Sequence, residues 1–313
     1  MKVAILDLGT NTFNLVVAEK QNEKEFRIIH SSKLPVKLGE GGINRGEITQ
    51  QSYDRGIGAV LEHYKVIKQF EVSRIRSFGT SGLRSASNGV DFISAIKAKT
   101  GIDIEIISGD LEAELIYYGV RQTIPSINKK YVILDIGGGS NELIIADNQQ
   151  IYWKKSYELG IARLLERFSP SDPITKNEVK VIRDFIRSET GDLIDQAGKY
   201  NIDLLIGASG SFETFVAMIE AENNNAETET GLVARSVKVK IQDFEKLHNK
   251  LIHSTIEERK QMKGLEPMRI EMIVLASVLV NYLKETLGIK TIMQSNFSLK
   301  EGAIYRLMTG YDE

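Results

Sequence analysis

The sequence predicts an α/β protein built from two duplicated domains around an interdomain cleft. Residues 5–18 read ILDLGTNTFNLVVA and residues 133–146 read ILDIGGGSNELIIA; the segments align without a gap, with Asp7 on Asp135. Patterns typical of strands and helices alternate after each copy, as in layered α/β proteins. The 313 residues suffice for two domains at roughly 100–200 residues each. We therefore expect two related domains that open with the same supersecondary unit.

Each copy has the pattern of a buried strand, a glycine-rich turn and a returning strand. The first strands, expected at Val3–Leu6 and Val132–Leu134, are apolar and β-branched, and each runs into an aspartate. The returning strands are expected at Leu15–Ala18 and Leu143–Ala146.

Further strands and helices follow each unit. In the first half we expect a strand at Arg74–Phe78, a turn at Thr80–Leu83, a helix at Asn88–Lys99 closed by Gly101, a strand at Ile102–Ile107 and a helix at Leu111–Val120. In the second half we expect a long helix at Thr175–Ala197, a strand at Asp203–Ile206, a turn at Gly207–Ser211 and a helix at Phe212–Glu222. The second half is completed by a mobile loop at Asn223–Glu229, a helix at Arg269–Leu287 ending at Gly288, a strand at Thr291–Met293 and a helix at Lys300–Met308.

The domain boundary is expected near Thr123–Lys130, where Pro125 and Ser126 interrupt the pattern. This places the first domain at residues 1–124 and the second at residues 125–299. The helix within residues 300–313 is expected to pack back on the first domain.

Composition excludes several classes of protein. With 42% hydrophobic and 26% charged residues the chain is not disordered. The 40 basic and 42 acidic side chains nearly balance, which argues against binding through non-specific charge, so we expect no DNA or RNA partner. The absence of cysteine excludes disulfides, thiol nucleophiles and cysteine-ligated zinc, and fits the cytoplasm, where we expect the protein.

A membrane partner is not expected either. The longest apolar stretch, Met272–Val280, is far below the roughly 20 residues of a spanning helix. The first nine residues carry Asp7 within their apolar run and lack the features of a targeting segment.

The two related turns, Gly9–Thr12 and Gly137–Ser140, suit the binding of phosphate. Glycines let successive backbone N–H groups converge on an anion, and a terminal Thr or Ser adds a hydroxyl. The aspartate before each turn offers a hard oxygen to Mg²⁺ or to its bound water. One such turn alone is as readily an ordinary tight hairpin, but two on duplicated domains can hold opposite ends of a phosphate chain.

The turn at Gly207–Ser211 lies between a strand and a helix, so loop amides and a helix N-terminus can both face an anion there. An ordinary strand-to-helix connection is the alternative. Other catalytic signatures are missing: the sequence contains neither G-x-x-x-x-G-K-[ST] nor H-E-x-x-H. None of its four histidines accompanies a nucleophile-like serine motif, which disfavours a Ser-His triad.

The segments DLGTN at 7–11 and DIGGGS at 135–140 resemble the actin, Hsp70 and sugar-kinase superfamily. Four stretches are more specific: TSGLRSASN at 80–88, ISGDLEAELIYYG at 107–119, GGGSNE at 137–142 and GASGS at 207–211. Together they resemble the exopolyphosphatase / guanosine pentaphosphate phosphohydrolase (Ppx/GppA) family, from residue 1 to about 305. This resemblance implies two actin-like (ribonuclease H-like) domains.

The resemblance implies hydrolysis of a terminal phosphoryl group of polyphosphate or guanosine pentaphosphate with Mg²⁺. By position, Glu112 matches the family's catalytic glutamate, Asp135 and Glu142 its other acidic site residues, and Arg84 its phosphate-contacting arginine. The candidate catalytic residues are therefore Glu112 and Glu142, and the candidate metal ligands are Asp7, Asp135 and Glu142. The candidate phosphate-binding residues are Gly9, Thr10, Asn11, Thr12, Arg84, Gly137, Gly138, Gly139, Ser140, Gly207, Ser209, Gly210 and Ser211.

Several points stay open at this stage. Mn²⁺ is an alternative to Mg²⁺, a monovalent cation such as K⁺ a further candidate, and homodimerisation is undecided. A non-catalytic guanosine tetra- or pentaphosphate sensor and a sugar-kinase-type phosphotransferase are the alternative functions. Asn296 and Lys300 replace an acid and an arginine of the family pattern. Because the chain ends at Glu313, we expect action on short polyphosphate chains. Candidate cations for attracting a polyanion are Lys33, Lys37, Arg45, Lys154 and Lys155.

Overall fold

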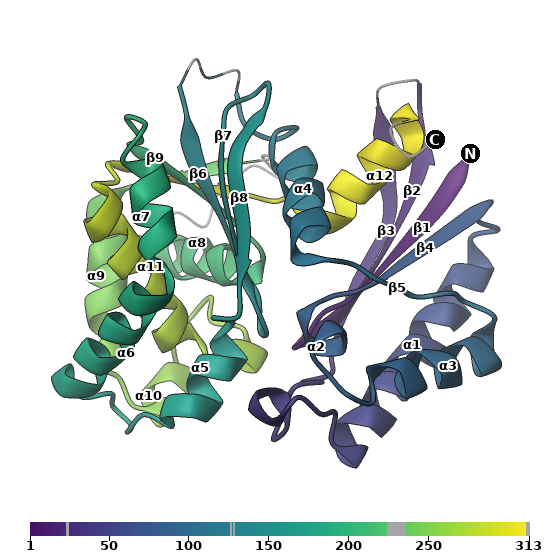
Figure 1. Ribbon diagram of the computed structural model, residues 1–313, viewed down its shortest axis with the longest axis horizontal. Coiled ribbons are helices and arrows are strands. Elements are labelled where there is room, and N and C mark those ends of the chain that lie inside the picture. The colour runs from purple at the N-terminus through teal and green to yellow at the C-terminus, as the bar shows by residue number, and fades with distance from the viewer. Residues whose placement is uncertain (23–24, 126, 128, 224–235, 311–313) are drawn as a thin grey trace.

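Two mixed sheets stand side by side in the computed structural model, each covered by helices (Figure 1). The structure describes the whole chain except residues 23–24, 126, 128, 224–235 and 311–313. The first sheet has the order β3-β2-β1-β4-β5 and the second β10-β11-β9-β6-β7-β8. The first sheet comprises β1 (Lys2–Leu8), β2 (Thr12–Lys20), β3 (Phe26–Pro35), β4 (Arg74–Gly79) and β5 (Glu105–Ile106). The second comprises β6 (Tyr131–Ile136), β7 (Asn141–Ala146), β8 (Ile151–Tyr157), β9 (Leu204–Ala208), β10 (Ser236–Val239) and β11 (Thr291–Ser295).

The repeat in the sequence corresponds to a repeated pattern of strand pairing in the two sheets. β1 pairs antiparallel with β2 and parallel with β4, and β6 pairs in the same way with β7 and β9. The registers agree too, since Asp7 lies opposite Asn14 and Asp135 opposite Glu142. The hairpin turns close alike, with Gly9 N–H donating to the Thr12 carbonyl at 3.1 Å and Gly137 N–H to that of Ser140 at 3.0 Å. The expected fold class, two duplicated domains of α/β type, is confirmed.

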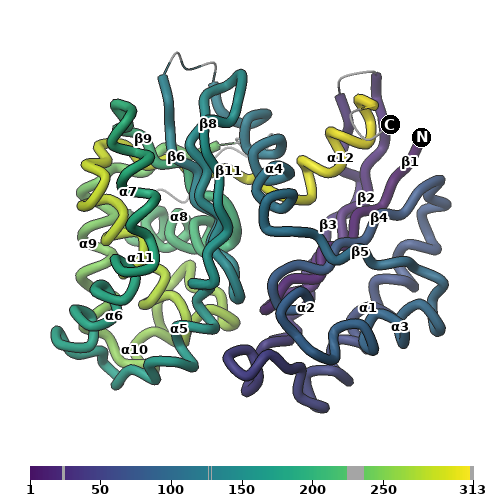
Figure 2. The backbone as a smooth tube through the Cα atoms, in the orientation of Figure 1, coloured from purple at the N-terminus to yellow at the C-terminus, as the bar shows by residue number. Residues whose placement is uncertain are grey.

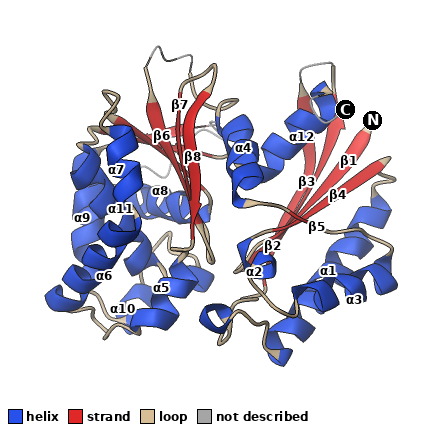
Figure 3. Cartoon of the chain, in the orientation of Figure 1, coloured by secondary structure: helices blue, strands red, loops and turns tan. Residues whose placement is uncertain are grey.

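Helices cover both faces of each sheet (Figure 3). Side chains alternate along β1, so that Ala4, Leu6 and Leu8 pack under α1 and α3, whereas Val3 and Ile5 face the other domain. The helices of the first half are α1 (Gln50–Gln69), α2 (Ser81–Arg84), α3 (Gly89–Thr100) and α4 (Gly109–Val120). Those that follow are α5 (Ile161–Phe168), α6 (Lys176–Glu189), α7 (Gly191–Ala197), α8 (Gly210–Glu222), α9 (Ile241–Ile252), α10 (Ile256–Lys260), α11 (Ile273–Leu287) and α12 (Leu299–Thr309).

Between the two sheets lie α4 and α12 (Figure 2). They pack on each other, α4 also against β7 and β8, and α12 against β1 and β2. Their backbones touch, since a Cβ on Gly119 would overlap the Ser298 carbonyl and one on Gly302 would overlap that of Leu115. This contact places the first turn of α12 against the second half of α4.

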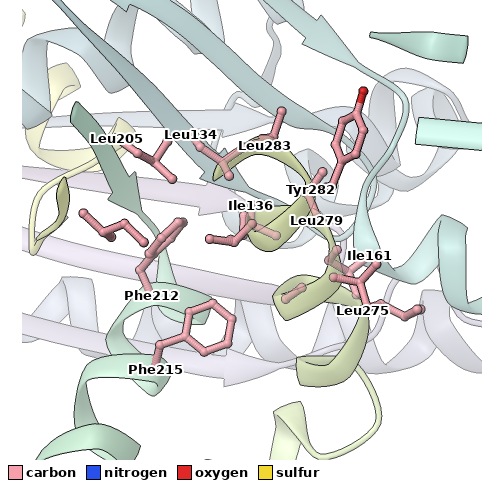
Figure 4. Packing of buried hydrophobic residues seen from close by; sticks show 14 of the residues in the cluster. Leu134, Ile136, Ile161, Leu205, Phe212, Phe215, Leu275, Leu279, Tyr282 and Leu283 are labelled. Carbon is pink, nitrogen blue, oxygen red and sulfur yellow. The ribbon is translucent and has the colours of Figure 1, made fainter. Parts of the chain in front are cut away.

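The outer face of the second sheet buries the largest apolar cluster. Phe212 and Phe215 of α8 and Leu275 and Leu279 of α11 pack there beneath Leu134 of β6 (Figure 4). This core positions the N-terminus of α8 next to the end of β6. Among the described residues, no helix combines the length and apolar character needed to cross a bilayer.

Several expected elements differ in extent. The turn expected at Thr80–Leu83 is a short helix, α2, and the strand expected at Ile102–Ile107 is reduced to β5. The single helix expected at Thr175–Ala197 is wrong: α6 and α7 are separated at buried Thr190, whose hydroxyl donates to the Ile186 carbonyl at 2.7 Å.

Two expected helix ends are confirmed, whereas one expected helix start differs. Gly101 and Gly288 end α3 and α11 with φ of 73° and 66°, as expected. The helix expected from Arg269 begins only at Ile273, after a 3₁₀ turn, Pro267–Arg269. Of the loop expected at Asn223–Glu229, residues 224–229 lie outside the described residues.

Candidate functional site

A cavity of about 460 Å³ opens between the domains where β1 and β6 end. Both glycine turns of the repeat line it, together with the N-termini of α8 and α12 and one face of α4. The predicted site residues on its wall are Asp7, Gly9, Thr10, Asn11, Thr12, Glu112, Asp135, Gly137, Gly138, Gly139, Ser140, Glu142, Ser209 and Gly210.

The turn Gly137–Ser140 is held from behind by the start of α5. The carbonyl of Gly137 accepts from Ile161 N–H at 2.9 Å, and that of Gly138 accepts from Ala162 N–H at 2.9 Å. In a trans peptide the following N–H points away from the carbonyl. The N–H groups of residues 138–140 are therefore directed away from α5, towards the cavity, where such a row of donors suits an anion.

The turn Gly9–Thr12 is anchored in a similar way within the first domain. The Asn11 carbonyl accepts from the N–H groups of Val36 and Lys37, both at 2.9 Å, and the Thr10 carbonyl accepts from Gly39 N–H at 3.3 Å. Residues 36–39 hold the carbonyls of the first turn as the start of α5 holds those of the second, so the two turns present equivalent edges to the same space.

Four carboxylates surround the cavity, of which Glu112, Asp135 and Glu142 are buried and Asp7 is half-buried. Asp7 accepts from the Asn14 amide at 2.9 Å, and Asp135 accepts from the Ser298 hydroxyl. Oε1 of Glu142 accepts from the hydroxyls of Ser140 and Ser156, both at 2.7 Å. In each of these three groups these hydrogen bonds use a single carboxylate oxygen.

Glu112, the fourth, lies in the first turn of α4 and is 7% exposed. Ser108 caps this helix by accepting from Leu111 N–H at 3.1 Å, and the helix dipole favours an anion here. Nη1 of Arg84 donates to Oε2 of Glu112 at 3.0 Å and to the Ile107 carbonyl at 2.9 Å. The hydrogen bond from Arg84 thereby fixes the orientation of the Glu112 carboxylate.

The electrostatics of the cavity favour protonated carboxyls. Burial, followed by the charge of Glu142, raises the pKa of Glu112 well above its usual range, and Arg84 only partly offsets this. Burial raises the pKa of Asp135 to about 6, and it raises that of Asp7 as well. Burial, with the charge of Asp135, also raises the pKa of Glu142. The site therefore holds more negative charge than its surroundings neutralise.

These carboxylates fit a hydrated divalent cation better than a closed protein cage. Among the described residues no three His, Cys, Asp or Glu side chains converge as a complete metal site. Mg²⁺ typically takes one or two carboxylates, several waters and substrate phosphate oxygens. Asp7, Asp135 and Glu142, hard oxygen donors with raised pKa values, suit that mode of binding.

Three predicted residues do not line the cavity within the described structure. Arg84 lies behind Glu112 and contacts it rather than the open space. Gly207 lies in β9, where a Cβ would overlap the Phe212 ring. The Ser211 hydroxyl is buried and accepts from Arg269 at 3.4 Å.

Sequence reasoning missed several wall residues. Ser81 and Arg269 line the cavity, as does Ser298, which reaches Asp135 from the start of α12. The sequence S-x-x-E at Ser298–Glu301, which forms a capping box here, was a local signal for that helix start but not for its contact. Asn296 and Lys300, known only as departures from the family pattern, also line the cavity. Burial works against the charge of Lys300, yet Glu301 and Asp7 outweigh it and raise the pKa of its ammonium.

Of the five cations proposed to attract a polyanion, only Lys33 and Lys37 line the cavity within the described structure. Both bridge the domains at its rim, Lys33 to Glu266 at 2.7 Å and Lys37 to Glu271 at 3.2 Å. The other three pair away from the cavity: Arg45 with Glu47, Lys154 with Glu114 and Lys155 with Asp192.

Comparisons with known proteins find similar sequences along almost the whole chain. The model of the Ppx/GppA phosphatase family matches residues 16–310. Exopolyphosphatase 1 of Mycobacterium leprae is 26% identical over 309 residues, covering 98% of this chain and 89% of that protein. A guanosine-5'-triphosphate,3'-diphosphate pyrophosphatase of Photobacterium profundum is 25% identical over 308 residues, covering 98% of this chain but 59% of that protein.

Solved structures agree as well. The crystal structure of an exopolyphosphatase from Cytophaga hutchinsonii superposes with a TM-score of 0.95 at 32% identity, covering 99% of this chain and 98% of that one. The Ppx/GppA family member of Aquifex aeolicus superposes with a TM-score of 0.81 at 22% identity, covering 100% and 99%, and shares the fold.

Proposed function

Because the chain belongs to the Ppx/GppA phosphatase family, we propose that it hydrolyses the terminal phosphoanhydride bond of inorganic polyphosphate. The observation that carries this proposal is Glu112, a buried carboxylate fixed by Arg84 on the wall of a cavity lined by two backbone turns. Relatives from Mycobacterium leprae and Cytophaga hutchinsonii bear the name exopolyphosphatase.

Glu112 is the general base of the proposed reaction. A carboxylate whose pKa is raised, as that of Glu112 is, accepts a proton more effectively than an ordinary one. Glu112 orients a water molecule and takes its proton as the water oxygen attacks the terminal phosphorus. The bond from that phosphorus to the bridging oxygen breaks, and the shortened chain leaves with the electron pair and the negative charge.

The turns and the hydroxyls bind the phosphoryl oxygens. The N–H groups of Gly138, Gly139 and Ser140 face the cavity and stabilise negative charge without rearranging. Thr10 and Ser81 offer hydroxyls from the first domain. Catalysis of phosphoryl transfer depends mainly on such positioning and charge stabilisation.

Asp7, Asp135 and Glu142 would hold the divalent cation. When bound, such an ion neutralises phosphate oxygens and lowers the repulsion between substrate and carboxylates. We propose Mg²⁺ on the chemistry of these donors, with Mn²⁺ and K⁺ as further ions to test.

The cavity wall favours an inorganic chain over a nucleotide. Among the described residues that line it there is no Phe, Tyr or Trp to stack a guanine base. The cations Lys33, Lys37 and Arg269 occupy its rim instead, where further phosphates of a chain would lie.

Phosphate release from polyphosphates of graded length, measured beside guanosine pentaphosphate with Mg²⁺, Mn²⁺ or neither, tests the proposal. We expect polyphosphate to be the better substrate, and Glu112→Gln to lower kcat by about 10²–10⁴-fold while inorganic phosphate still binds. Asp110→Asn is the matched control, because Asp110 lies in the same first turn but is exposed. Undiminished turnover by Glu112→Gln would refute the role of Glu112, and binding of guanosine pentaphosphate without turnover of either compound would favour a sensor.

A further inference from the structure

The start of α5 approaches the phosphate-binding turn more closely than ordinary packing requires. A Cβ on Gly160 would overlap the backbone of Gly138, so this contact is between two main chains. The carbonyls of residues 137–139 all point towards α5. The helix therefore determines which way the opposite N–H groups face.

Arg163 completes this contact from the first turn of α5. It is 8% exposed, and its Nε donates to the Gly139 carbonyl at 2.8 Å. Its other two nitrogens donate to the first domain, Nη1 to the Ile43 carbonyl at 2.9 Å and Nη2 to the Ser85 hydroxyl at 2.8 Å. One planar guanidinium thus joins the turn of one domain to two segments of the other.

The bridge continues to a second part of the cavity wall. The Ser85 hydroxyl donates to the Ser81 carbonyl at 2.9 Å while it accepts from Arg163, and Ser81 lines the cavity. The Arg163 carbonyl in turn accepts from the Asn44 amide at 3.2 Å. Elements of both domains that line the cavity are thus connected through Arg163.

The positive charge of Arg163 is only weakly matched by a carboxylate. Glu158 lies 3.9 Å away and its side chain is 73% exposed, so solvent screens that pair. Carbonyl and hydroxyl dipoles satisfy the rest of the guanidinium. The charge polarises the peptide of Gly139 and Ser140, and that peptide's N–H points to the anion side of the turn.

We propose that Arg163 is a positioning residue that holds the turn Gly137–Ser140 in its anion-binding conformation only while the two domains are closed upon each other. The inference rests on the proposed function for its role in catalysis. Arg163 does not line the cavity among the described residues, so it acts through Gly139 and not on substrate. Separation of the domains removes the Ile43 and Ser85 acceptors, which orient the guanidinium on Gly139, while the backbone contacts of α5 with the turn remain.

Calorimetric binding of inorganic phosphate tests this inference apart from turnover. We expect Arg163→Met to weaken phosphate binding by about tenfold or more and to lower kcat in phosphate release. Arg163→Lys keeps the charge but not the three-way geometry, so we expect an intermediate affinity. Ser85→Ala removes one acceptor of the first domain, and a loss of about three- to tenfold in affinity is expected.

Arg45→Met is the matched control, because Arg45 belongs to the segment beside Ile43 but pairs with Glu47 at the surface. If Arg163→Met does not fold, the phosphate affinities of Arg163→Lys and Ser85→Ala test the inference. Wild-type phosphate affinity in both, with unchanged thermal midpoints, would overturn the inference, as would a wild-type protein that binds no inorganic phosphate. A wild-type protein that binds phosphate but releases none from polyphosphate would refute the proposed function alone.

Discussion

Asp7 and Asp135 occupy the same position in the two halves of the molecule, each near the end of a central strand and on the wall of one cavity. Their partners across the hairpin differ, because Asp7 faces the neutral amide of Asn14 and Asp135 lies beside the acid Glu142. The two hairpins are therefore not equivalent, because only the second has an acid, Glu142, across from its aspartate.

This crowding predicts that removing a site carboxylate stabilises the protein at alkaline pH. A group whose pKa is higher in the folded than in the unfolded state binds more protons when the protein is folded. The stability that it contributes to the protein is therefore fully present below about pH 4.5 and is lost as pH rises through the pKa of the folded state. Burial raises the pKa of Glu142 to about 7, which sets the upper end of that range. Thermal denaturation in the presence of a chelator should show a falling midpoint between pH 5 and pH 8, the range we infer from these shifts.

Glu142→Gln should flatten that profile, with a gain of about 2 kcal/mol at pH 8 and little change near pH 4.5. The amide oxygen can still accept from Ser140 and Ser156, so the local structure is retained. Loss of stability at pH 8 would show that the hydrogen bonds, and not repulsion, dominate at this position.

The pH dependence of activity should follow Glu112. The base must be deprotonated, so kcat/KM should rise with pH through the raised pKa of Glu112, above the usual carboxylate range of about 4–5. Arg84 lowers that pKa, whereas Glu142 and Asp7 raise it. In Arg84→Met the rise should move to higher pH, as measured by phosphate release from polyphosphate over the pH range. A lower apparent pKa in this variant would contradict the assignment of Glu112 as the base.

The repeated turn units could be predicted from the sequence because their determinants are local. Glycines, hydroxyls and aspartates within 14-residue segments specify both hairpins, and the registers at Asp7 and Asp135 agree with the alignment. The long helix was wrong because its amphipathic pattern continues across Thr190, where a buried hydroxyl bonded to Ile186 ends α6. Hydrophobic periodicity does not register such a break.

The contacts that assemble the site are non-local and could not be predicted. Ser298 meets Asp135 from 163 residues away, a distance in sequence that no motif spans. Arg163 lies in a segment for which the sequence predicted no element, and its buried guanidinium donates to the Gly139 carbonyl of the turn and to Ile43 and Ser85 of the opposing domain. Both side chains become recognisable only when the two domains are placed together.

Two glycine-to-alanine substitutions should distinguish a glycine required by close backbone contact from one that has free space around it. Gly160→Ala would push a methyl group into the backbone of Gly138 and is expected to cost about 1–3 kcal/mol and to impair phosphate binding. Gly58→Ala, in an exposed turn of α1 with open space around it, is expected to stabilise by about 0.5–1 kcal/mol. Denaturant unfolding of both variants checks the pair, and equal effects of the two would contradict the close contact.

The ion pairs at the rim predict how a polyanion enters. Lys33 and Lys37 bridge the domains through Glu266 and Glu271, but all four side chains are partly exposed, so each pair contributes only about 0–1 kcal/mol. A chain of phosphates can therefore displace the glutamates. Glu266→Gln frees Lys33 and Arg269, whose guanidinium also contacts Glu266 at 3.1 Å. We expect KM for polyphosphate to fall by about two- to fivefold at low ionic strength, and the difference to vanish in high salt as screening sets in.

Glu47→Gln is the matched control for this prediction, because it frees Arg45, which does not line the cavity among the described residues. Its KM should stay at the wild-type value. If Glu266→Gln raises KM instead, the ion pair serves to keep the domains closed around the substrate. In that case the same variant should also bind inorganic phosphate more weakly, because Arg163 holds its turn only when Ile43 and Ser85 remain within reach.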